Sequence, residues 1–419
     1  MLRAHVTELS YNDEELTRLT FPRETLRVTR GIGSGLSRRE EHAPHVVWAV
    51  GDRGPNLGLQ LAIERYGLEN LSVHADKPGA KLMPCPGIGP AIVELHVSRH
   101  HVTAQRTILL SDVAGRPLSG LPPAGTPARN VEPALGVDGS VHPSDPAGAD
   151  TEGLAAAPDG SFWIGDEYGP SLLHIGPGGS VRARWVPAGT EAVFAGANYP
   201  VAGALPALAA RRRLNRGIEG MSLSTDGRRL HLAFQSPLAH PDDSVGRRAR
   251  HVRLWTLETS SGALLSEHLY PLDRPGSFRR DCDRGNVDRG DVKLGDMAAL
   301  AADSLLVLER VSATTKLYLV TLDPERSLGA HWRDPETRPT IEQLSADDAL
   351  ALPVIDKWLV FSTDDHPEIV ADLEGLALLD ERTILLVNDN DFGIEGVATR
   401  FWRVELAEPL NGSDASLHQ

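Results

Sequence analysis

Short apolar runs alternate with polar turns along most of the 419-residue chain. The runs FWIG, LHLAF, LLVL and ILLV hold only four or five residues each, and they lack the 3.6-residue spacing of an amphipathic helix. A first apolar strand precedes each run and follows a short turn that often reads Glu-Gly, and a carboxylate or amide ends the run. This pattern predicts β-structure made of repeated hairpins.

Two of these hairpins carry a strong turn signal. Asp159-Gly160 and Asp226-Gly227 stand between apolar strands, where Asp-Gly favours a tight two-residue turn. Five copies of the hairpin can be recognised, and the strand-like segments that follow them bring each unit to about four strands. The predicted repeat cores lie near residues 33–53, 150–167, 217–235, 293–310 and 372–391.

Repeated four-stranded units that pack around an axis form a β-propeller. We therefore expect an all-β chain that folds as a single β-propeller domain over residues 1–419, with five to six blades. The repeats are longer than the roughly 40–50 residues of a usual blade, so long loops must be inserted. Residues 115–150 are predicted to form such a loop, and residues 407–419 a flexible tail. A β-sandwich is the main alternative, but it does not explain an acidic residue at the same place in each copy.

An acidic residue leads the first strand of four copies. First strands line the central channel of a propeller, so equivalent residues should lie at one height around the axis. At ~4 Å and an effective dielectric of about 20, each pair of like charges costs roughly 4 kcal/mol, and a bound cation removes this cost. Oxygen ligands without thiols favour Ca²⁺ over zinc. The alternative is a turn in which each glutamate only binds backbone amides. The predicted metal ligands are Glu152, Glu219, Asp296 and Glu374, with Ser34 at this place in the first copy.

A second row of charged residues closes the second strands of the hairpins. Arginines in this row are suited to bidentate capture of phosphate or carboxylate groups, and a glutamate could act as a general base on water. The alternative is a network of salt bridges at the rim of the blades. The predicted catalytic residues are Asp52, Arg53, Asp166, Glu167 and Arg310. The predicted substrate-binding residues are Lys293, Glu309, Asp389 and Asp391.

The formal net charge is −15, from 57 acidic and 42 basic residues. This excess of acid argues against a nucleic-acid partner, whose phosphates need a basic surface, although it can also serve solubility alone. Cys85 and Cys282 are too few for a zinc cluster, but one disulfide is possible. No signal peptide and no run of 18 apolar residues stand out. We expect a cytoplasmic monomer that does not span a membrane.

Five ordered segments together look like the phytase-like family, which is named for the esterase-like activity of phytase. They are VVWAVGDRG (46–54), DTEGLAAAPDGSFWIGDEYG (150–169), NRGIEGMSLSTDGRRLHLAFQ (215–235), GDMAALAADSLLVLERV (295–311) and DLEGLALLDERTILLVNDNDFG (372–393). The resemblance covers residues 25–406. It implies a β-propeller that often binds metal and is often exported, and it implies a phosphoric-ester hydrolase. The matching positions are Asp52, Arg53, Glu152, Asp166, Glu167, Glu219, Glu309, Arg310, Glu374, Asp389 and Asp391.

We therefore expect a hydrolase that acts on a phosphoric ester of a small, anionic molecule, with Ca²⁺ or another divalent cation as cofactor. A cation at the acidic ring would polarise the phosphoryl oxygen, and Arg53 and Arg310 would stabilise the developing charge. Two alternatives stay open. One is a lactonase or carboxylic esterase on the same propeller, and the other is a non-enzymatic propeller that binds a small ligand or a protein.

Overall fold

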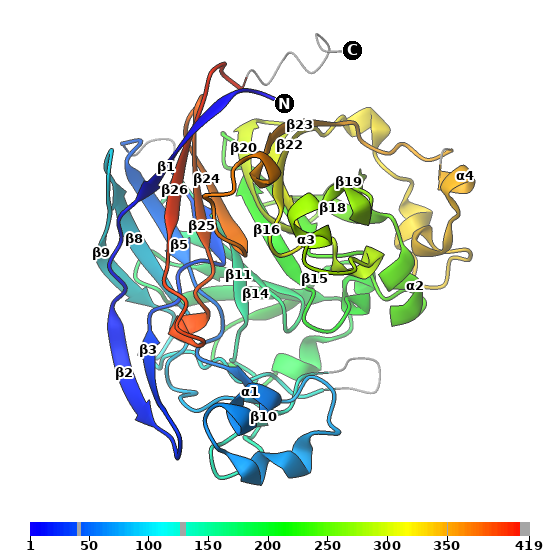
Figure 1. The fold of residues 1–419 in the computed structure, drawn as a ribbon. Coiled ribbons are helices and arrows are strands. Elements are labelled where there is room, and N and C mark those ends of the chain that lie inside the picture. The colour runs from blue at the N-terminus through cyan, green and yellow to red at the C-terminus, as the bar shows by residue number, and fades with distance from the viewer. Residues whose placement is uncertain (40–42, 126–130, 350, 411–419) are drawn as a thin grey trace.

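Strands form nearly all of the regular structure of this protein (Figure 1). The computed structural model describes residues 1–39, 43–125, 131–349 and 351–410. The α-helices in these stretches are short: α1 (Leu59–Glu64), α2 (Asp243–Arg248), α3 (Arg279–Cys282) and α4 (Ala346–Ala349). In the part of the chain that the structure describes, no helix is long and apolar enough to cross a membrane. The predicted all-β class is confirmed.

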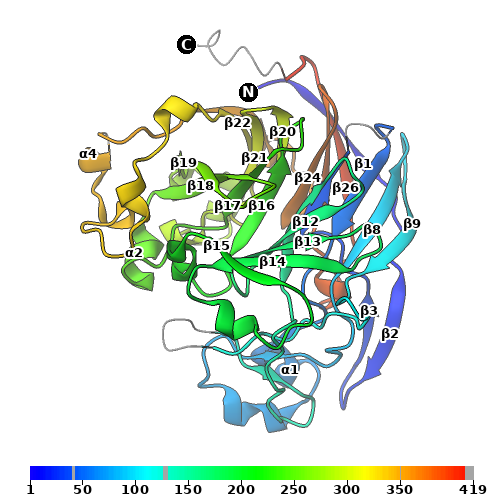
Figure 2. The ribbon, with the colours of Figure 1, turned by 180° about the vertical axis from the view of Figure 1, so that it is seen from behind.

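Five sheets, which we number 1 to 5 in chain order, form the body of the described chain. Sheet 1 contains β4 (Gly35–Ser37), β5 (Val46–Val50), β8 (Ala91–Val97) and β9 (Val102–Leu109). Sheet 2 contains β11 (Thr151–Ala156), β12 (Phe162–Asp166), β13 (Ser171–Ile175), β14 (Val181–Pro187) and β15 (Val201–Leu205). Sheet 3 contains β16 (Ile218–Leu223), β17 (Arg229–Phe234), β18 (His251–Glu258) and β19 (Leu264–Pro271). Figure 2 shows sheet 2 in green beside sheet 1 in blue to cyan.

The last two sheets follow the same plan, but sheet 5 takes its outer strand from the N-terminus. Sheet 4 contains β20 (Lys293–Ala301), β21 (Ser304–Arg310), β22 (Thr315–Thr321) and β23 (Lys357–Ser362). Sheet 5 contains β24 (Leu373–Asp380), β25 (Thr383–Asn388), β26 (Phe401–Leu406) and β1 (Ala4–Leu9). Strand β1 pairs antiparallel with β26, with Ala4 opposite Leu406. The two ends of the repeat array are therefore joined within one sheet.

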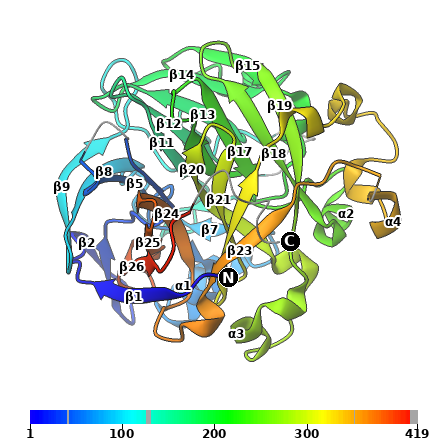
Figure 3. The same ribbon diagram turned by 90° about the horizontal axis from the view of Figure 1, so that it is seen from above.

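The first strands of the five sheets form a closed ring at the centre of the molecule. Strand β4 contacts β11, β11 contacts β16, β16 contacts β20, β20 contacts β24, and β24 returns to β4. The sheets extend outward from this ring, and Figure 3 shows them around it from above. The architecture is thus propeller-like, and the inner strands are the first strands of the hairpins predicted from the sequence.

The second strands are buried on both faces, which explains why they read as continuous apolar runs. Leu305, Leu306, Val307 and Leu308 of β21 are all fully buried. Neighbouring sheets pack through aromatic side chains as well, because the rings of Trp48 in sheet 1 and Phe162 in sheet 2 meet edge to face with centroids 5.0 Å apart. The core therefore lies between the sheets.

Inserted segments cover one end of the ring. A hairpin of β2 (Glu15–Thr20) and β3 (Thr25–Thr29), helix α1 and a small sheet of β6 (Leu57–Gly58), β7 (Lys81–Leu82) and β10 (Ala134–Leu135) lie at the bottom of Figure 1. The predicted loop 115–150 therefore carries one short strand in its described part, and β10 pairs in parallel with β7. Residues 411–419 of the predicted tail lie outside the described residues. Cys85 and Cys282 are not joined in a disulfide.

Candidate active site at the ring of inner strands

The inner strands approach each other so closely that glycine must follow the ring position in β4 and β11. A Cβ on Gly153 would lie 2.3 Å from the carbonyl oxygen of Glu219, and a Cβ on Gly35 would lie 2.5 Å from that of Glu152. The ladder between β16 and β17 shifts register at the same point, and such a bulge changes the direction of nearby side chains. Glu-Gly is thus part of the inner strand, where it combines close backbone packing with a carboxylate at the axis.

Three of the four predicted metal ligands meet at the covered end of the ring. Carboxylate oxygens of Glu152, Glu219 and Glu374 lie within 4.8 Å of one another. Glu219 is 1% exposed, and burial raises its pKa. Its Oε1 accepts a hydrogen bond of 2.6 Å from Gln235 Nε2, whereas its buried Oε2 has no hydrogen-bond partner. The sequence pattern thus located the centre of the cluster.

Asp296, the fourth predicted ligand, does not join this group. Its Oδ2 accepts the backbone N–H groups of Leu36 (2.9 Å) and Leu376 (3.0 Å), and its Oδ1 accepts that of Met297 (2.8 Å). The motif in β20 reads Gly-Asp where sheets 2, 3 and 5 read Glu-Gly, so Gly295 occupies the ring position and Asp296 the position of the glycine. A shift of one residue turns a strand side chain to the other face. Asp296 therefore binds the backbone of the inner strands.

A second carboxylate group shares Glu152 with the first. Oxygens of Asp52, Asp150 and Glu152 lie within 4.8 Å of one another. Asp150 is completely buried, and neither of its carboxylate oxygens accepts a hydrogen bond from a residue that the structure describes. Burial raises the pKa of Asp150 well above its ordinary value, although Arg53 Nη1, 3.2 Å from its Oδ2, opposes this shift. Sequence reasoning missed Asp150, which could have been found because it stands two residues before Glu152 in an extended segment.

The two groups have the chemistry of a cation site. Glu152, which they share, is 9% exposed, and its carboxylate makes no hydrogen bond within the described stretches. Burial and then the negative charges of Glu219 and Asp52 raise the pKa of Glu152. A hard divalent cation binds carboxylate oxygens and would offset both this repulsion and the burial of charge. The acidic cluster could therefore hold a metal ion with oxygen ligands alone.

Arg53 is fixed beside the second group by residues from separate loops. Its Nη1 forms an ion pair of 2.5 Å with Glu132, and its Nη2 donates to Asn215 Oδ1 at 2.9 Å. The guanidinium also lies over the ring of Tyr168. Glu132 and Asn215 were not predicted, because nothing in the repeat pattern connects these loops with Arg53. Arg53 is 4% exposed, and its buried Nε lies 3.4 Å from Asp52 Oδ1 but forms no hydrogen bond with a described residue.

Arg310 brings a second guanidinium to the ring. It forms ion pairs with Glu374 and, at 3.2 Å, with Asp372. Lys293 lies opposite Arg310 in the ladder between β20 and β21. Burial and then the positive charges of Arg310 and Arg216 lower the pKa of Lys293 to about 7. The side of the ring formed by sheet 4 therefore places the basic side chains of Arg310 and Lys293 beside the carboxylates.

The adjacent residues Asp166 and Glu167 have different environments. Asp166 forms a fully buried ion pair of 2.7 Å with Arg184 and accepts a hydrogen bond of 2.6 Å from Ser171, so it joins strands within sheet 2. Glu167 Oε1 instead accepts the backbone N–H of Gly217 at 2.8 Å. Burial and then the charge of Glu219 raise the pKa of Glu167 to about 8. Of the predicted pair, Glu167 is thus the one that belongs to the ring.

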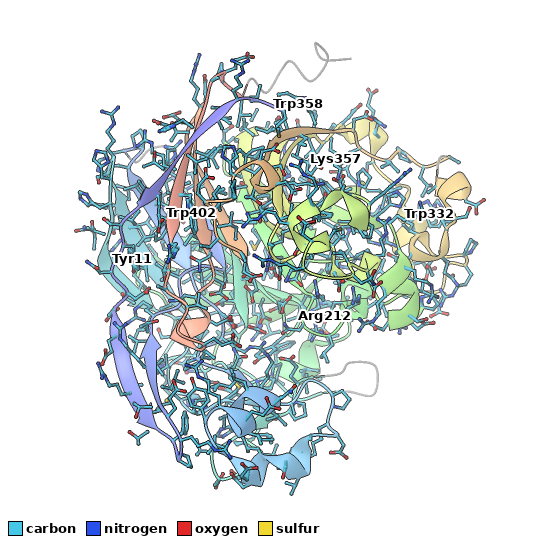
Figure 4. The ribbon with its side chains drawn as sticks, viewed as in Figure 1. Tyr11, Arg212, Trp332, Lys357, Trp358 and Trp402 are labelled. Carbon is cyan, nitrogen blue, oxygen red and sulfur yellow. The ribbon has the colours of Figure 1, made fainter. Side chains whose placement is uncertain are left out.

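Glu309 lies in a different polar cluster, between sheets 3 and 4. It accepts hydrogen bonds from Tyr270 Oη (2.7 Å), Lys357 Nζ (2.5 Å) and the backbone N–H of Asp273 (2.7 Å). Figure 4 labels Lys357 in the upper part of the molecule, well above Arg212 near the covered end of the ring. Glu309, which was predicted to bind substrate, is therefore held by side chains and backbone of sheets 3 and 4 and is not part of the two carboxylate groups.

Asp389 and Asp391 follow β25 near the ring. Asp389 is half-buried, and its Oδ1 accepts the backbone N–H of Asp391 at 3.1 Å. Burial and then the charges of Asp391 and Asp52 raise the pKa of Asp389 well above its ordinary value. Asp391 is exposed and has a left-handed backbone, with φ of 46°. Asp389 thus extends the acidic surface next to Asp52, whereas Asp391 lies at its outer edge.

Several known proteins resemble this chain. A protein of Arthroderma benhamiae described as an uncharacterized secreted protein is 26% identical over 250 residues, which are 54% of this chain and 46% of that protein. The chain thus spans less than half the length of this relative, whose description gives the expected cytoplasmic location no support. Virginiamycin B lyase from Staphylococcus aureus is 12% identical, with a TM-score of 0.31 over 96% of this chain and 100% of that one. Aldose sugar dehydrogenase from Streptomyces coelicolor is 12% identical, with a TM-score of 0.34 over 97% and 99%.

A family model described as "Phytase-like: Esterase-like activity of phytase" matches residues 31–392. This range begins just before the first inner strand and ends just after β25, so it contains all five inner strands of the ring. It also contains both carboxylate groups and the two arginines beside them. The match confirms the resemblance seen in the five sequence segments, and the chain belongs to the phytase-like family.

Proposed function

We propose that this protein is a hydrolase of phosphoric esters that depends on a divalent cation, and that its five sheets are the blades of a β-propeller. One observation carries the proposal. At the covered end of the ring, Glu152 belongs to two groups of three carboxylates, and Arg53 and Arg310 lie beside these groups. Carboxylates in this number suit a cation, and arginines suit a phosphate. Membership of the phytase-like family supports a hydrolase of esters.

The cation would be held by the two carboxylate groups. Among the described residues, Asp150 Oδ1 and Glu219 Oε2 are buried carboxylate oxygens without a hydrogen-bond partner, and Asp150 Oδ2 has only the ion pair with Arg53 Nη1 at 3.2 Å. When bound there, a divalent cation would supply a Lewis acid for the phosphoryl oxygen. Ca²⁺ is the cation we favour, because it accepts six to eight oxygen ligands in flexible geometry. The residues that would hold it are Asp52, Asp150, Glu152, Glu219 and Glu374.

The cationic side chains would bind and orient the substrate. Among the described residues, Arg310 Nε has no hydrogen-bond partner and Arg53 Nε has only an ion-pair contact of 3.4 Å with Asp52 Oδ1, so each retains a donor for a phosphate oxygen. Their remaining donors are fixed by carboxylates and by Asn215, which limits the rotation of the guanidinium groups. Lys293 lies next to Arg310 and would complete the cationic side. Positioned charge of this kind stabilises the negative charge that develops on a phosphoryl group.

Glu167 would activate the attacking water. One oxygen of its carboxylate is held by the N–H of Gly217, while the other makes no hydrogen bond within the described stretches. A carboxylate that is fixed at one oxygen and free at the other can accept a proton from water in a defined direction. This assigns the role of base to Glu167, and it leaves Asp166 to hold sheet 2 together.

The substrate class and the location of the protein are part of the same proposal. The substrate would be a small anionic molecule, since the ring is covered by inserted loops and presents cations on one side. We propose an exported protein in place of the cytoplasmic one, because the relative from Arthroderma benhamiae is described as secreted. A Ca²⁺ site made of largely buried loop and strand carboxylates suits a compartment where calcium is abundant.

The test combines metal analysis of the purified protein with a panel of phosphoric esters, lactones and carboxylic esters, each with and without a chelator. We expect turnover of phosphoric esters that the chelator abolishes and Ca²⁺ restores. The double variant Glu152→Gln/Glu219→Gln should lose bound metal and turnover together. A matched control, Glu325→Gln/Glu408→Gln, removes two exposed carboxylates that make no side-chain hydrogen bond in the structure and should change neither.

Two results would overturn the proposal. If the double variant lost the metal but kept its turnover, the cation would have no part in the reaction. If the protein hydrolysed lactones or carboxylic esters but no phosphoric ester, the lactonase or carboxylic esterase alternative would replace it.

A further inference from the structure

A cavity outside the ring is lined by several basic side chains, although the protein as a whole is acidic. It has a volume of about 440 Å³ and lies where β18 begins and β19 ends. In the ladder of sheet 3, His251 of β18 pairs with Pro271 of β19 at this end. The described residues that line the cavity include no carboxylate. Its charged or titratable lining residues are Arg250, His251, Arg274, Arg289 and Arg326.

Two of the four arginines are held in place. Arg289 Nη1 donates to the backbone carbonyl of Asp273 at 2.9 Å. Arg326 Nη2 donates to the carbonyl of Val354 at 2.6 Å, and its Nη1 pairs with Asp356 at 3.0 Å. These contacts set the positions of the guanidinium groups at the cavity wall, and Asp356 neutralises only one of them.

The other two arginines are available for a ligand. The side chains of Arg250 and Arg274 are exposed and form no ion pair or hydrogen bond with any described residue. Their charges act on the rest of the cavity: after burial, Arg250 and Arg274 are among the causes that lower the pKa of Arg289. Burial and then Arg250 and Arg289 lower the pKa of His251. The positively charged side chains of the cavity thus repel one another, and a bound anion would offset this repulsion.

The remaining lining is apolar. Pro271, Leu272, Ala349, Leu352 and Val354 form it, and Leu272 and Ala349 are buried. An inorganic ion would leave this surface without a partner, whereas an organic group would bury it. Of the four positive charges of the arginines, Asp356 neutralises one, and the remaining three exceed what one carboxylate can neutralise. Arginine forms bidentate hydrogen bonds with phosphate, which offers several acceptor oxygens in one group.

We propose that this cavity, which is separate from the ring, is a binding site for an organic ligand that carries two or more phosphate groups. The phosphates lie among the four arginines, and the organic part lies against Leu272 and its apolar neighbours. We assign the site a binding role, because its described lining residues supply cations and apolar surface. It goes beyond the proposed function, since it does not use any residue of the ring.

The test uses isothermal titration calorimetry on the full chain in metal-free buffer with a chelator, which keeps divalent cations from binding at the ring. The probes are ADP, pyrophosphate and citrate. The variant Arg250→Gln/Arg274→Gln removes the two unpaired cations, and Arg3→Gln/Arg228→Gln is its matched control. Arg3 and Arg228 are exposed, their side chains make no described ion pair, and their replacement changes the net charge by the same amount.

We expect one ADP to bind per chain, with tighter binding than pyrophosphate and at least tenfold tighter binding than citrate. Arg250→Gln/Arg274→Gln should weaken ADP binding tenfold or more, and the control variant should leave it unchanged. Equal weakening in both double variants would reduce the effect to net charge and overturn the proposal. It would also be overturned by citrate binding as tightly as ADP, or by no binding of ADP at millimolar concentration. Thermal unfolding of both variants, measured in parallel, establishes that the cavity is still folded.

Discussion

The carboxylate of Asp296 accepts the backbone N–H of Leu36 at 2.9 Å, although the two residues lie 260 positions apart in the chain. The same oxygen accepts the N–H of Leu376 at 3.0 Å. Asp296 of β20 is therefore bonded to β4 and β24, which are the first and last inner strands. One side chain at the axis joins both ends of the ring.

Removal of this carboxylate should destabilise the whole fold. In Asp296→Ala, the N–H groups of Leu36 and Leu376 would stay buried without an acceptor, and each such donor costs ~1–3 kcal/mol. We expect the free energy of unfolding to fall by about 3 kcal/mol or more, and Asp296→Asn, which keeps one acceptor oxygen, to lose less. Urea unfolding measures this, with Asp283→Ala as an exposed control. Equal stability of Asp296→Ala and the control would contradict the assignment.

The ion pair of Asp166 and Arg184 should matter for stability rather than for substrate turnover. Both side chains are fully buried, 2.7 Å apart. Loss of one partner leaves an uncompensated buried charge, so Asp166→Asn should lower the free energy of unfolding by ~3–5 kcal/mol. The double variant Asp166→Asn/Arg184→Met should recover part of this loss, because the unpaired charge is gone. Chemical denaturation of the two variants gives the comparison, and a double variant less stable than Asp166→Asn would disprove the pairing.

His231 should make the fold sensitive to mild acid. Burial lowers its pKa from 6.5 to about 4, and the neutral ring accepts from Thr256 and donates to the carbonyl of Ala302. The unfolded chain binds a proton near pH 6.5, whereas the folded chain does so only near pH 4. Stability is therefore full above pH 6.5 and falls between these values, by about 3 kcal/mol in total. Unfolding free energies from pH 4 to 8 should show this slope in the wild type and in His100→Gln and a clearly smaller one in His231→Gln, because the pKa values of His174, His240 and His251 are also lowered by burial.

The ring of inner strands was largely predictable because each of its motifs lies within a few consecutive residues. Glu-Gly precedes an apolar strand in three copies, and the three glutamates Glu152, Glu219 and Glu374 do meet. Asp296 was wrongly placed with the glutamates because the motifs were compared by residue type and not by the order of the acid and the glycine. In β20 the glycine comes before the acid, and an offset of one residue reverses the direction of a strand side chain.

The second row was less predictable, since its members depend on partners far away in the chain. Asp166 and Glu309 end their strands as Asp52 and Asp389 do, but Arg184 neutralises the first and Lys357 the second. No repeat position marks these cations. Strand β1 escaped prediction for a related reason, because it belongs to no hairpin copy and pairs only with β26 at the far end of the sequence.

Removal of divalent cations should destabilise the wild-type protein more than it destabilises the Glu152→Gln variant. The carboxylates of Asp150, Glu152 and Glu219 are buried within 4.8 Å of a neighbour and lack protein partners for several oxygens. A cation at 100 times its dissociation constant would stabilise the fold by ~2.7 kcal/mol, and Glu152→Gln removes the ligand shared by both groups. The midpoint of thermal unfolding should therefore differ strongly between chelator and added Ca²⁺ for the wild type and for Glu325→Gln. It should differ little for Glu152→Gln. An equal shift in all three proteins would place the stabilising cation elsewhere.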